Sequence, residues 1–587
     1  MAVLRGLATI DVCDERRWPP ALRRIRTWCH GRGHRYHDEH CWCTDRDSTG
    51  VSRFLAVDQG VVLIAAPYKI DRRGFLRQSA MAGAAIACGL PGASWAVQRD
   101  QLHIRNYLDI ASLDPPFSLS GADNLIQRVI YLNLLRFKTD GSWETELDAA
   151  EYFEAIDDTH YAFRLKSGLM FSDGFGEMTA DDVKFSFERI IDPDVNAINA
   201  PDMGTLSHVD VHDRYSGTIV LKSPYSVFVP MAAASYGIMS RKALTSVGGR
   251  FSTQPPCCSG PYRVREWQAK RKTILEKNPV WDGPDAAFSE IHVYAMTDAK
   301  AAEMAFEAGQ LDCAEISVES VEPFRKQLPP DSHLEVLPSG RNFWLGINQS
   351  NPALQDLKIR QAVQYAIDAE AVVEANWFGL TEPAMGPVPR GMLGCRDRTL
   401  VPHSGDAEKA RALLREAGVE LPLRLRLDIA SDTIYLTAAQ VIQWSLKKVG
   451  IEVDIRTHDA GTFLTLGQES AGDQWKDLQL FFTSFIGSSD PFYSLVWFIT
   501  EQMGHWNWER FSNEEFDRLN GLAQAINDTA ERDRMYRRMQ DIMEESGCYR
   551  FICNGVMPQI VRNSIAPAFT PDGYALLRGF HPVGSKT

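Results

Sequence analysis

Residues 344–394 read WLGINQSNPALQDLKIRQAVQYAIDAEAVVEANWFGLTEPAMGPVPRGMLG and contain, in order, a strand, a polar loop, two helices and a proline-rich turn. Residues 343–347 are apolar and are followed by polar residues, a pattern that predicts a buried strand. The next apolar residues recur at helical spacing and form one face: Ile359, Val363, Ala366 and Ile367. Asp368 is suited to cap a second helix, which we expect to end at Gly379.

Composition limits the classes of protein to consider. The 587 residues suffice for two or more domain-sized units with buried cores. A hydrophobic content of 44% and a charged content of 24% are typical of a soluble globular protein. The net charge of −14 argues against nucleic acid as a partner, because a phosphate backbone requires a basic surface. No apolar run approaches the length that spans a bilayer.

Outward from residues 344–394, short apolar strands alternate with helical segments. This alternation begins at Gln101 and predicts an α/β fold. Residues 124–135 have the spacing of an amphipathic helix, and apolar residues alternate with others over 161–165 as in a half-buried strand. Thr179, with Asp182 three residues later, comes close to a capping box and predicts a helix start.

Five blocks of the sequence match, in order, the motifs of one protein family. They are a K-x-G-x-x-F-x-D-G loop followed by T-A-x-D-V-x-F-S, a G-P-Y loop followed by an E-x-N-P strand, an E-x-G-x-x-D turn, an R-Q-A-x-x-x-A-I-D helix, and a later helix. The matching residues lie in segments 166–186, 259–279, 305–312, 360–389 and 407–418. On these residues, the chain from about Gln101 to Val583 resembles solute-binding protein family 5, the periplasmic peptide, dipeptide and nickel-type proteins of ABC importers.

The resemblance implies a fold and a function. The fold is a two-lobed periplasmic-binding-protein fold of type II, in the large peptide-binding class, with an extra subdomain in lobe one. Alignment of the blocks gives lobe one as residues 98–341 plus 554–587 and lobe two as residues 342–553. The implied function is capture of a peptide or peptide-like ligand between the lobes, by a monomer that delivers it to a membrane permease and its ATPase subunits.

A second signal lies near the N-terminus. Residues 71–77, DRRGFLR, resemble a twin-arginine export motif through Arg72 and Arg73. An apolar run and the A-x-A pattern ending at Ala96 follow, so we expect a signal peptide over 71–96 and a periplasmic protein. Lipidation at Cys88 is the alternative.

Residues 1–70 fit neither interpretation. They are rich in histidine and cysteine, but the spacing matches no zinc-binding pattern. We expect a disordered leader or the product of a mis-assigned start.

Six cysteines follow the predicted cleavage point: Cys257, Cys258, Cys313, Cys395, Cys548 and Cys553. Their pairing does not follow from the sequence. Cys548 and Cys553 form a local candidate disulfide, and buried thiols are the equally plausible alternative.

The sequence carries no recognised catalytic motif, with no G-x-S-x-G elbow, Walker A loop, H-E-x-x-H pair or Rossmann glycine pattern. We therefore expect a binding protein that is not an enzyme and has no cofactor or metal. The alternatives are an exported metal- or cofactor-dependent enzyme, and a chemoreceptor-docking binding protein on the same fold.

The resemblance also implies where the ligand binds. Family members that take peptides often hold the ligand's ammonium group with an aspartate in a W-x-x-D-x-x-D-P stretch. Residues 484–491 here read SFIGSSDP, so Ser484 replaces the tryptophan and Gly487 replaces that aspartate. The usual amine-binding carboxylate is therefore missing. Asp490 either takes over its role or forms only an Asp-Pro turn.

The other ligand-site candidates have two interpretations each. Tyr236 lies where lobe one approaches the cleft in the family, and Ser259 lies in a loop beside the family's pocket. Arg341, near the expected hinge, either binds a ligand carboxylate or forms a salt bridge. Four aromatic residues offer a stacking surface or belong to the core: Trp344, Phe485, Trp506 and Trp508. Trp506 and Trp508 flank one residue, so an extended segment would turn both to one side.

Overall fold

The structure, a computed structural model, describes residues 100–584 apart from 119, 235, 285 and 488, together with three strands nearer the N-terminus. The chain divides into two compact units that meet between Ala96 and Val97. The described part of the first unit is an antiparallel sheet of β1 (Trp42–Arg46), β2 (Ser52–Asp58) and β3 (Val61–Ile64). The predicted export motif and Cys88 lie outside the described residues.

The second unit is built on one ten-stranded mixed sheet, which confirms the predicted α/β class. Within it, β4 pairs in parallel with β15, and β18 pairs in parallel with β19 and β20. The strands follow the order β13 (Tyr262–Gln268), β14 (Lys272–Lys277), β15 (Glu290–Ala295), β4 (Gln101–Asn106), β16 (Cys313–Glu315), β21 (Tyr549–Arg562), β17 (Ser332–Ile347), β20 (Leu480–Ile486), β18 (Leu423–Ala430) and β19 (Ile451–His458).

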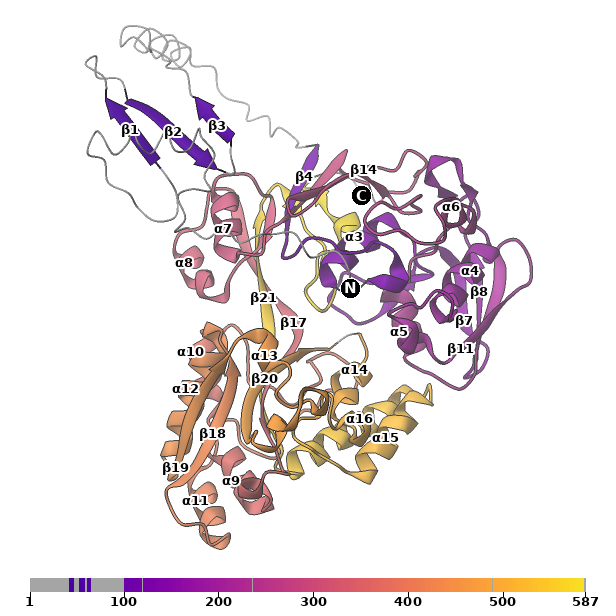
Figure 1. Cartoon of the computed structure of the whole chain (residues 1–587). Helices are drawn as coiled ribbons and strands as arrows, with labels where there is room; N and C mark the ends of the chain where they lie inside the picture. The colour runs from indigo at the N-terminus through magenta and orange to yellow at the C-terminus, as the bar shows by residue number, and fades with distance from the viewer. Residues whose placement is uncertain are drawn as a thin grey trace, which may run out of the picture. The chain divides into compact units, whose positions relative to one another are not determined.

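Two long antiparallel strands, β17 and β21, join the two halves of this sheet (Figure 1). One end of β21 pairs with β16, whereas the residues of β17 from Arg341 onward pair with β20. Their mutual register shifts between the pairs Pro338–Val556 and Asn342–Asn554, so three residues of β17 face one residue of β21. A β-bulge of this kind bends the strand and redirects its side chains.

Helices cover each half of the sheet and bury separate cores (Figure 1). In the first half, α3 (Gly121–Ile130), α7 (Ala299–Glu307) and α8 (Val321–Lys326) contribute apolar side chains. In the second half, the helices are α9 (Leu357–Ala366), α10 (Ala369–Trp377), α11 (Ala407–Glu416), α12 (Thr433–Lys447), α15 (Glu514–Gln524) and α16 (Thr529–Glu545). Each apolar stripe buries against its sheet, the usual source of helix stability in a globular protein.

A separate antiparallel sheet with its own core is formed by residues that follow β4 in the sequence. It has the order β11 (Leu206–Val211), β12 (Ser216–Leu221), β8 (His160–Leu165) and β7 (Ala150–Ala155), and α4 (Ala180–Ile191) packs on it. α4 begins with the predicted capping box of Thr179 and Asp182. This sheet lies where the resemblance places an extra subdomain.

Two helix boundaries can be compared with the prediction: the end of α3 differs from it, and the start of α10 agrees with it. The helix predicted over 124–135 ends at Ile130, and Leu135 instead opens β5 (Leu135–Phe137). The apolar spacing continues through this turn, because the residues after the helix are buried as well. α10 begins as predicted at Asp368, whose carboxylate accepts from the N–H of Ala371.

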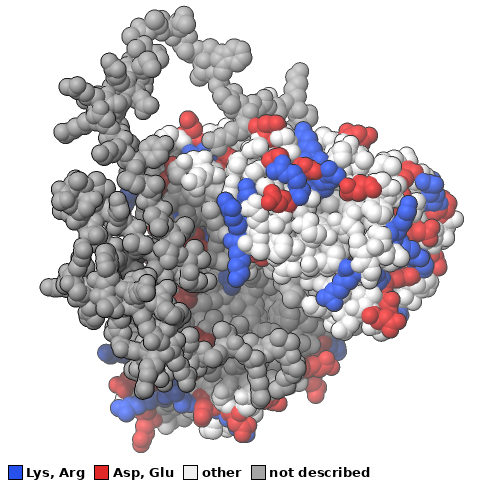
Figure 2. Space-filling model, turned by 45° about the horizontal axis from the view of Figure 1, so that its top comes forward, with Lys and Arg blue, Asp and Glu red and all other residues white. Residues whose placement is uncertain are grey.

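The surface carries both signs of charge. Basic and acidic side chains are interspersed on the face shown in Figure 2, without a large field of one sign. Among the described residues, no helix is both long enough and apolar enough to cross a membrane.

Candidate functional site

The last residues of β20 and the turn after it, residues 484–493, form the centre of the candidate site. This segment begins next to the bulge of β17, where Arg341 Nη1 donates to Ser484 Oγ at 3.0 Å. Tyr435 from α12 contacts the same hydroxyl at 2.8 Å. The N–H of Gly487 then donates to the carbonyl of Gly340 at 2.8 Å. A Cβ at Gly487 would lie 2.7 Å from Ser494 Oγ, so glycine permits this close approach.

Arg341 is half-buried and faces the first half of the sheet as well as the second. Its positive charge opposes an upward shift in the pKa of Glu315 at the end of β16. Burial is the larger effect, and it raises the pKa of Glu315 above its ordinary value. Tyr574 is also close enough for the charge of Arg341 to lower its pKa, although burial raises that pKa to about 12.

Glu315 and Tyr574 line a small cavity of about 50 Å³. Arg105 and Tyr107, at the end of β4, line it as well. Arg105 is fixed by backbone carbonyls, donating to Glu315 O at 2.7 Å and to Met296 O at 2.9 Å. The bulge of β17 therefore lies between residues 484–493 and a cavity that holds cationic, phenolic and carboxyl groups.

An aromatic cluster begins at the next residue of β20, Phe485, whose side chain lies on the opposite face of the sheet from Ser484. The ring of Phe485 is 5.6 Å from Trp506 and 6.1 Å from Trp497, and these two indoles are 6.1 Å apart. All three side chains are partly exposed. We call Phe485, Trp497 and Trp506 the aromatic wall. Rings held in this way present an apolar surface at low entropic cost on binding.

Trp344 is a core residue of this region. Its side chain is 1% exposed and packs 5.1 Å from Phe485, beneath the aromatic wall. Its Nε1 donates to the buried carboxyl of Glu509 at 2.7 Å. The prediction of Trp344 as a ligand-contacting residue is therefore corrected, because the whole ring is covered by protein.

Trp506 and Trp508 do not face the same side. The chain around them is a series of turns, in which the N–H of Trp508 donates to the carbonyl of Trp506. Trp508 is 3% exposed and packs against Phe481 and Phe463 in a separate core. The predicted pairing assumed extended backbone, which these turns replace. Of the two residues, Trp506 alone joins the aromatic wall.

Asp490 is occupied by protein groups. Arg532 Nη2 donates to both of its carboxylate oxygens, at 3.0 and 2.8 Å, and the N–H of Phe492 donates to Oδ1 at 3.0 Å. The side chain is 3% exposed. Of the two interpretations offered above, the turn-forming aspartate describes the structure. A ligand ammonium would have to displace a buried arginine.

Tyr236 and Ser259 lie away from Arg341. Tyr236 is 3% exposed in the core of the four-stranded sheet, where burial raises its pKa. Ser259 accepts from the N–H of Leu132 at 3.0 Å and is 2% exposed. It lines another cavity, of about 360 Å³, together with Trp281 and Arg578. The structure therefore leaves Ser259 apart from the other candidates, whereas Tyr236 belongs to the core against which Phe492 and Tyr493 pack.

Residues far apart in the sequence complete the candidate site. Tyr225 and Met231 contact Phe492 and Tyr493, with 6.4 Å between the rings of Tyr225 and Phe492 and 2.9 Å from Tyr493 Oη to Met231 Sδ. Sequence analysis found neither this contact nor Glu315, since no local pattern marks them. Their roles follow only from the way the sheets assemble.

Two further predictions concern cysteines and metals. All six cysteines after Val97 are free thiols. Cys553 lies in β21 and Cys548 directly precedes it, so about 16 Å of extended chain separates them. A disulfide requires about 4.4–6.8 Å between Cα atoms, which rules out the proposed local bond. Among the residues that the structure describes, no group of three or more His, Cys, Asp or Glu side chains is placed to hold a metal ion.

The chain is similar in sequence and in fold to known substrate-binding proteins. The chain is 26% identical over 480 residues to the probable D,D-dipeptide-binding periplasmic protein DdpA of Escherichia coli, covering 80% of this chain and 91% of the relative. It is 25% identical to the glutathione-binding protein GsiB of Salmonella paratyphi A, covering 74% of this chain and 85% of the relative. The substrate-binding protein CtaP of Listeria monocytogenes has the same two-lobed fold, with a TM-score of 0.72, 20% identity and coverage of 83% and 99%.

The family assignment rests on a model that matches most of the chain. Residues 144–504 match the model described as bacterial extracellular solute-binding proteins, family 5, middle region. This range includes the four-stranded sheet, Arg341, residues 484–493 and two members of the aromatic wall, Phe485 and Trp497. The chain therefore belongs to the family 5 extracellular solute-binding proteins, the periplasmic substrate-binding components of ABC importers.

Proposed function

We propose that this protein captures a peptide-like ligand between its two lobes and delivers it to an ABC permease with its ATPase subunits. The observation that carries this proposal is that the same end of β20, beside the bulge of β17, presents Arg341 with Ser484 on one face of the sheet and the aromatic wall on the other. The printed names of DdpA and GsiB, a dipeptide-binding and a glutathione-binding protein, support a peptide-like ligand. A reversible carrier requires affinity near micromolar, about −8 kcal/mol.

The proposed ligand has a carboxylate and an apolar group, and it does not need a free amine. Arg341 offers a guanidinium, which suits bidentate binding of a carboxylate. The aromatic wall offers a stacking surface. No carboxylate is free for an ammonium group at the two family positions, because Gly487 has no side-chain carboxylate and the carboxylate of Asp490 is paired with Arg532. An ammonium group would therefore find little compensation for its lost hydration in this segment.

The proposed lobes meet at the bulge. Lobe one comprises residues 98–341 and 554–587, and lobe two comprises residues 342–553. The shift in register between β17 and β21 falls at both crossings, which supports a hinge here. Hinges are commonly a few residues at the ends of elements that absorb backbone rotation.

We further propose export by the twin-arginine route with cleavage after Ala96, and a monomeric, non-enzymatic protein in the periplasm. The boundary between the two compact units falls between Ala96 and Val97, which supports cleavage at this point. N-terminal sequencing of the exported protein tests it: a start at Val97 is expected, and a lipidated Cys88 at the N-terminus would contradict it.

Isothermal titration calorimetry with a panel of dipeptides and their N-acetylated forms tests the ligand chemistry. We expect acetylation to change Kd less than about threefold, and Arg341→Met to weaken binding by tenfold or more. Arg424→Met is the control, because its side chain is 81% exposed on the far strand pair. A preference of more than tenfold for the free amine, or full affinity in the Arg341→Met variant, would overturn the proposed chemistry.

A further inference from the structure

Arg532 on α16 is a buried cation with a defined set of partners. It is 7% exposed. Its Nε donates to the carbonyl of Ala523 at 2.9 Å, and its Nη2 donates to Asp490 at 2.8 Å and to Tyr536 Oη at 3.2 Å. The guanidinium thus joins the C-terminal end of α15 to the turn at Asp490, which belongs to residues 484–493.

The same carbonyl of Ala523 receives a hydrogen bond from the proposed lobe one. Ser226 Oγ donates to it at 3.1 Å, and the N–H of Ser226 donates to the next carbonyl, that of Gln524, at 2.7 Å. Ser226 is 7% exposed. Because Ser226 and Gln524 are about 300 positions apart and lie in different proposed lobes, these bonds form only when the lobes are together.

A second contact between the proposed lobes depends on Asp490. Its carboxylate accepts from the N–H of Phe492 and so fixes the turn that carries Phe492 and Tyr493. These two side chains meet Tyr225 and Met231 of the proposed lobe one. Arg532 therefore holds both surfaces of lobe two that contact the segment around Ser226, one through Ala523 and the other through Asp490.

We infer that Arg532 is a positioning residue for an inter-lobe latch, formed by Ser226 with Ala523 and Gln524, and by residues 225–231 with Phe492 and Tyr493. The inference rests on the proposed function, since it concerns closure of the same site. Arg532 bonds to none of Arg341, Ser484 or the aromatic wall in the hydrogen bonds given above. It acts through Asp490 and Ala523, and it sets the fraction of molecules that are closed.

The consequence for binding follows from population arithmetic. If only the closed form binds tightly, the apparent Kd equals the intrinsic Kd divided by the closed fraction. A weakened latch therefore lowers affinity without altering any group at Arg341 or the aromatic wall. A merely structural arginine would lower the melting temperature and leave the opening equilibrium of the folded protein unchanged.

Amide hydrogen exchange of the segment around Ser226 tests the latch without any ligand. The N–H of Ser226 exchanges only when its bond to Gln524 opens. Well below the melting temperature, we expect Arg532→Met to speed this exchange at least tenfold and Ser226→Ala to speed exchange of the same segment about threefold. The control is Arg538→Met, which removes an arginine that also links α16 to α15, through Glu515 at 3.0 Å, but has no bond to Asp490 or Ala523.

The outcomes distinguish the latch from a purely structural role of Arg532 and from a general effect of removing any arginine that links α16 to α15. Unchanged exchange around Ser226 in Arg532→Met, with a lowered melting temperature, would overturn the latch and leave Arg532 a structural residue. Equal acceleration in Arg538→Met would also overturn it. If Arg532→Met does not fold, Ser226→Ala decides alone, and unchanged exchange in that variant contradicts the latch. Since no ligand takes part, a failure to find a peptide ligand leaves this test intact.

Discussion

At the residue scale, neighbours distant in sequence determine what each candidate side chain does. The Asp-Pro turn at Asp490 could be anticipated from the sequence, because aspartate before proline favours turns. Its partner Arg532 lies 42 positions away in sequence, and no local sequence pattern identifies that arginine as the partner. Trp344 was a reasonable candidate for ligand stacking, yet its indole is directed at Glu509, 165 positions further on. Such pairings depend on the assembled sheet.

Glu509 gives a prediction about pH. It is completely buried, and burial raises the pKa of its carboxyl from 4.5 to about 8, although the hydrogen bond from Trp344 lowers that pKa in part. Between these values the folded state binds more protons than the unfolded state, so the free energy of unfolding falls as pH rises. We expect this one group to contribute a decline of up to about 1.4 kcal/mol per pH unit.

The test is urea unfolding between pH 5 and 8. Glu509→Gln keeps an acceptor for Trp344 but cannot ionise, so the decline in unfolding free energy should become shallower. Glu416→Gln, which replaces an exposed carboxyl, should retain the wild-type slope. If all three proteins share one slope, Glu509 is not protonated in the folded state.

At the element scale, local signals fixed the starts of helices better than their ends or the turns. The capping residues Thr179 and Asp368 begin α4 and α10 as predicted, because an N-cap is a bond between neighbours in sequence. The end of α3 was misplaced because the residues beyond it are also buried. The turns around Trp506 were missed even though Gly504, which has a positive φ, and Asn507 lie within them, and both residue types favour turns.

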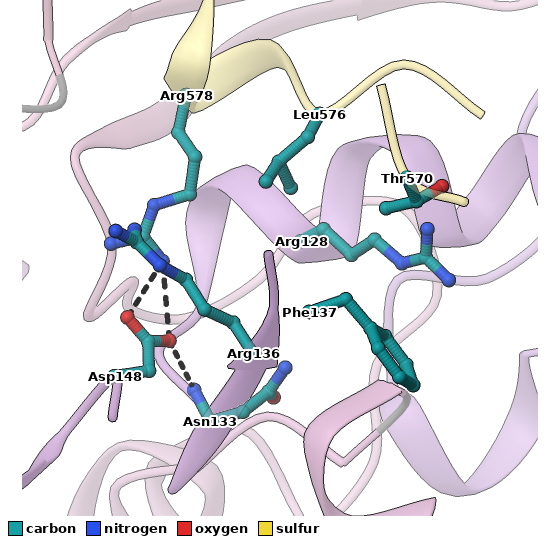
Figure 3. A pocket seen from close by; sticks show the side chains of 8 residues that line it. All are labelled: Arg128, Asn133, Arg136, Phe137, Asp148, Thr570, Leu576 and Arg578. Carbon is teal, nitrogen blue, oxygen red and sulfur yellow. Dashed lines mark hydrogen bonds and ion pairs between the residues drawn. The ribbon is translucent and has the colours of Figure 1, made fainter. Parts of the chain in front are cut away.

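One element is held by a buried ion pair. The C-terminal segment carries Arg578, whose Nη1 lies 2.9 Å from Asp148 Oδ1, and both side chains are nearly inaccessible (Figure 3). Asp148 also accepts from the N–H of Asn133 at 3.0 Å. Figure 3 shows Arg136 beside the same carboxylate, at the edge of a cavity that Arg128 and Phe137 also line.

Removal of one partner of this pair should be costly. We expect Arg578→Met to lower the free energy of unfolding by about 3–5 kcal/mol, because it leaves a buried carboxylate without its cation. Arg424→Met, whose partner Glu452 is also exposed, should cost about 0–1 kcal/mol. Chemical unfolding of both variants gives the comparison, and a loss below about 1 kcal/mol for Arg578→Met would mean that the pair does not hold the segment.

At the scale of the whole molecule, the sequence predicted the architecture well because its motifs occur in family order. The two-lobed fold follows from the same residues that the family model matches. The candidate site was predicted only in part. Arg341 contacts Ser484, Phe485 contacts Trp506, and Tyr236 lies in the core that packs against Tyr493, while Ser259 and Trp508 are buried elsewhere. Whether a residue in the right segment faces the site depends on turns and bulges that carry no strong local signal.

The aromatic wall provides a direct reporter of ligand capture. Trp497 and Trp506 are partly exposed beside Phe485, and their environment should become drier when a ligand packs against them. Binding of any ligand to the folded state should also raise the melting temperature by mass action.

The central claim is that this chain reversibly binds a peptide-like solute at Arg341 and the aromatic wall. The most direct test is a titration of intrinsic tryptophan fluorescence with a panel of dipeptides, N-acetylated dipeptides and glutathione. We predict a saturable shift in emission with a midpoint near micromolar for at least one compound, and loss of that shift in the Trp497→Phe/Trp506→Phe double variant. A panel in which no compound changes the emission, or a shift that persists in the double variant, would contradict the claim.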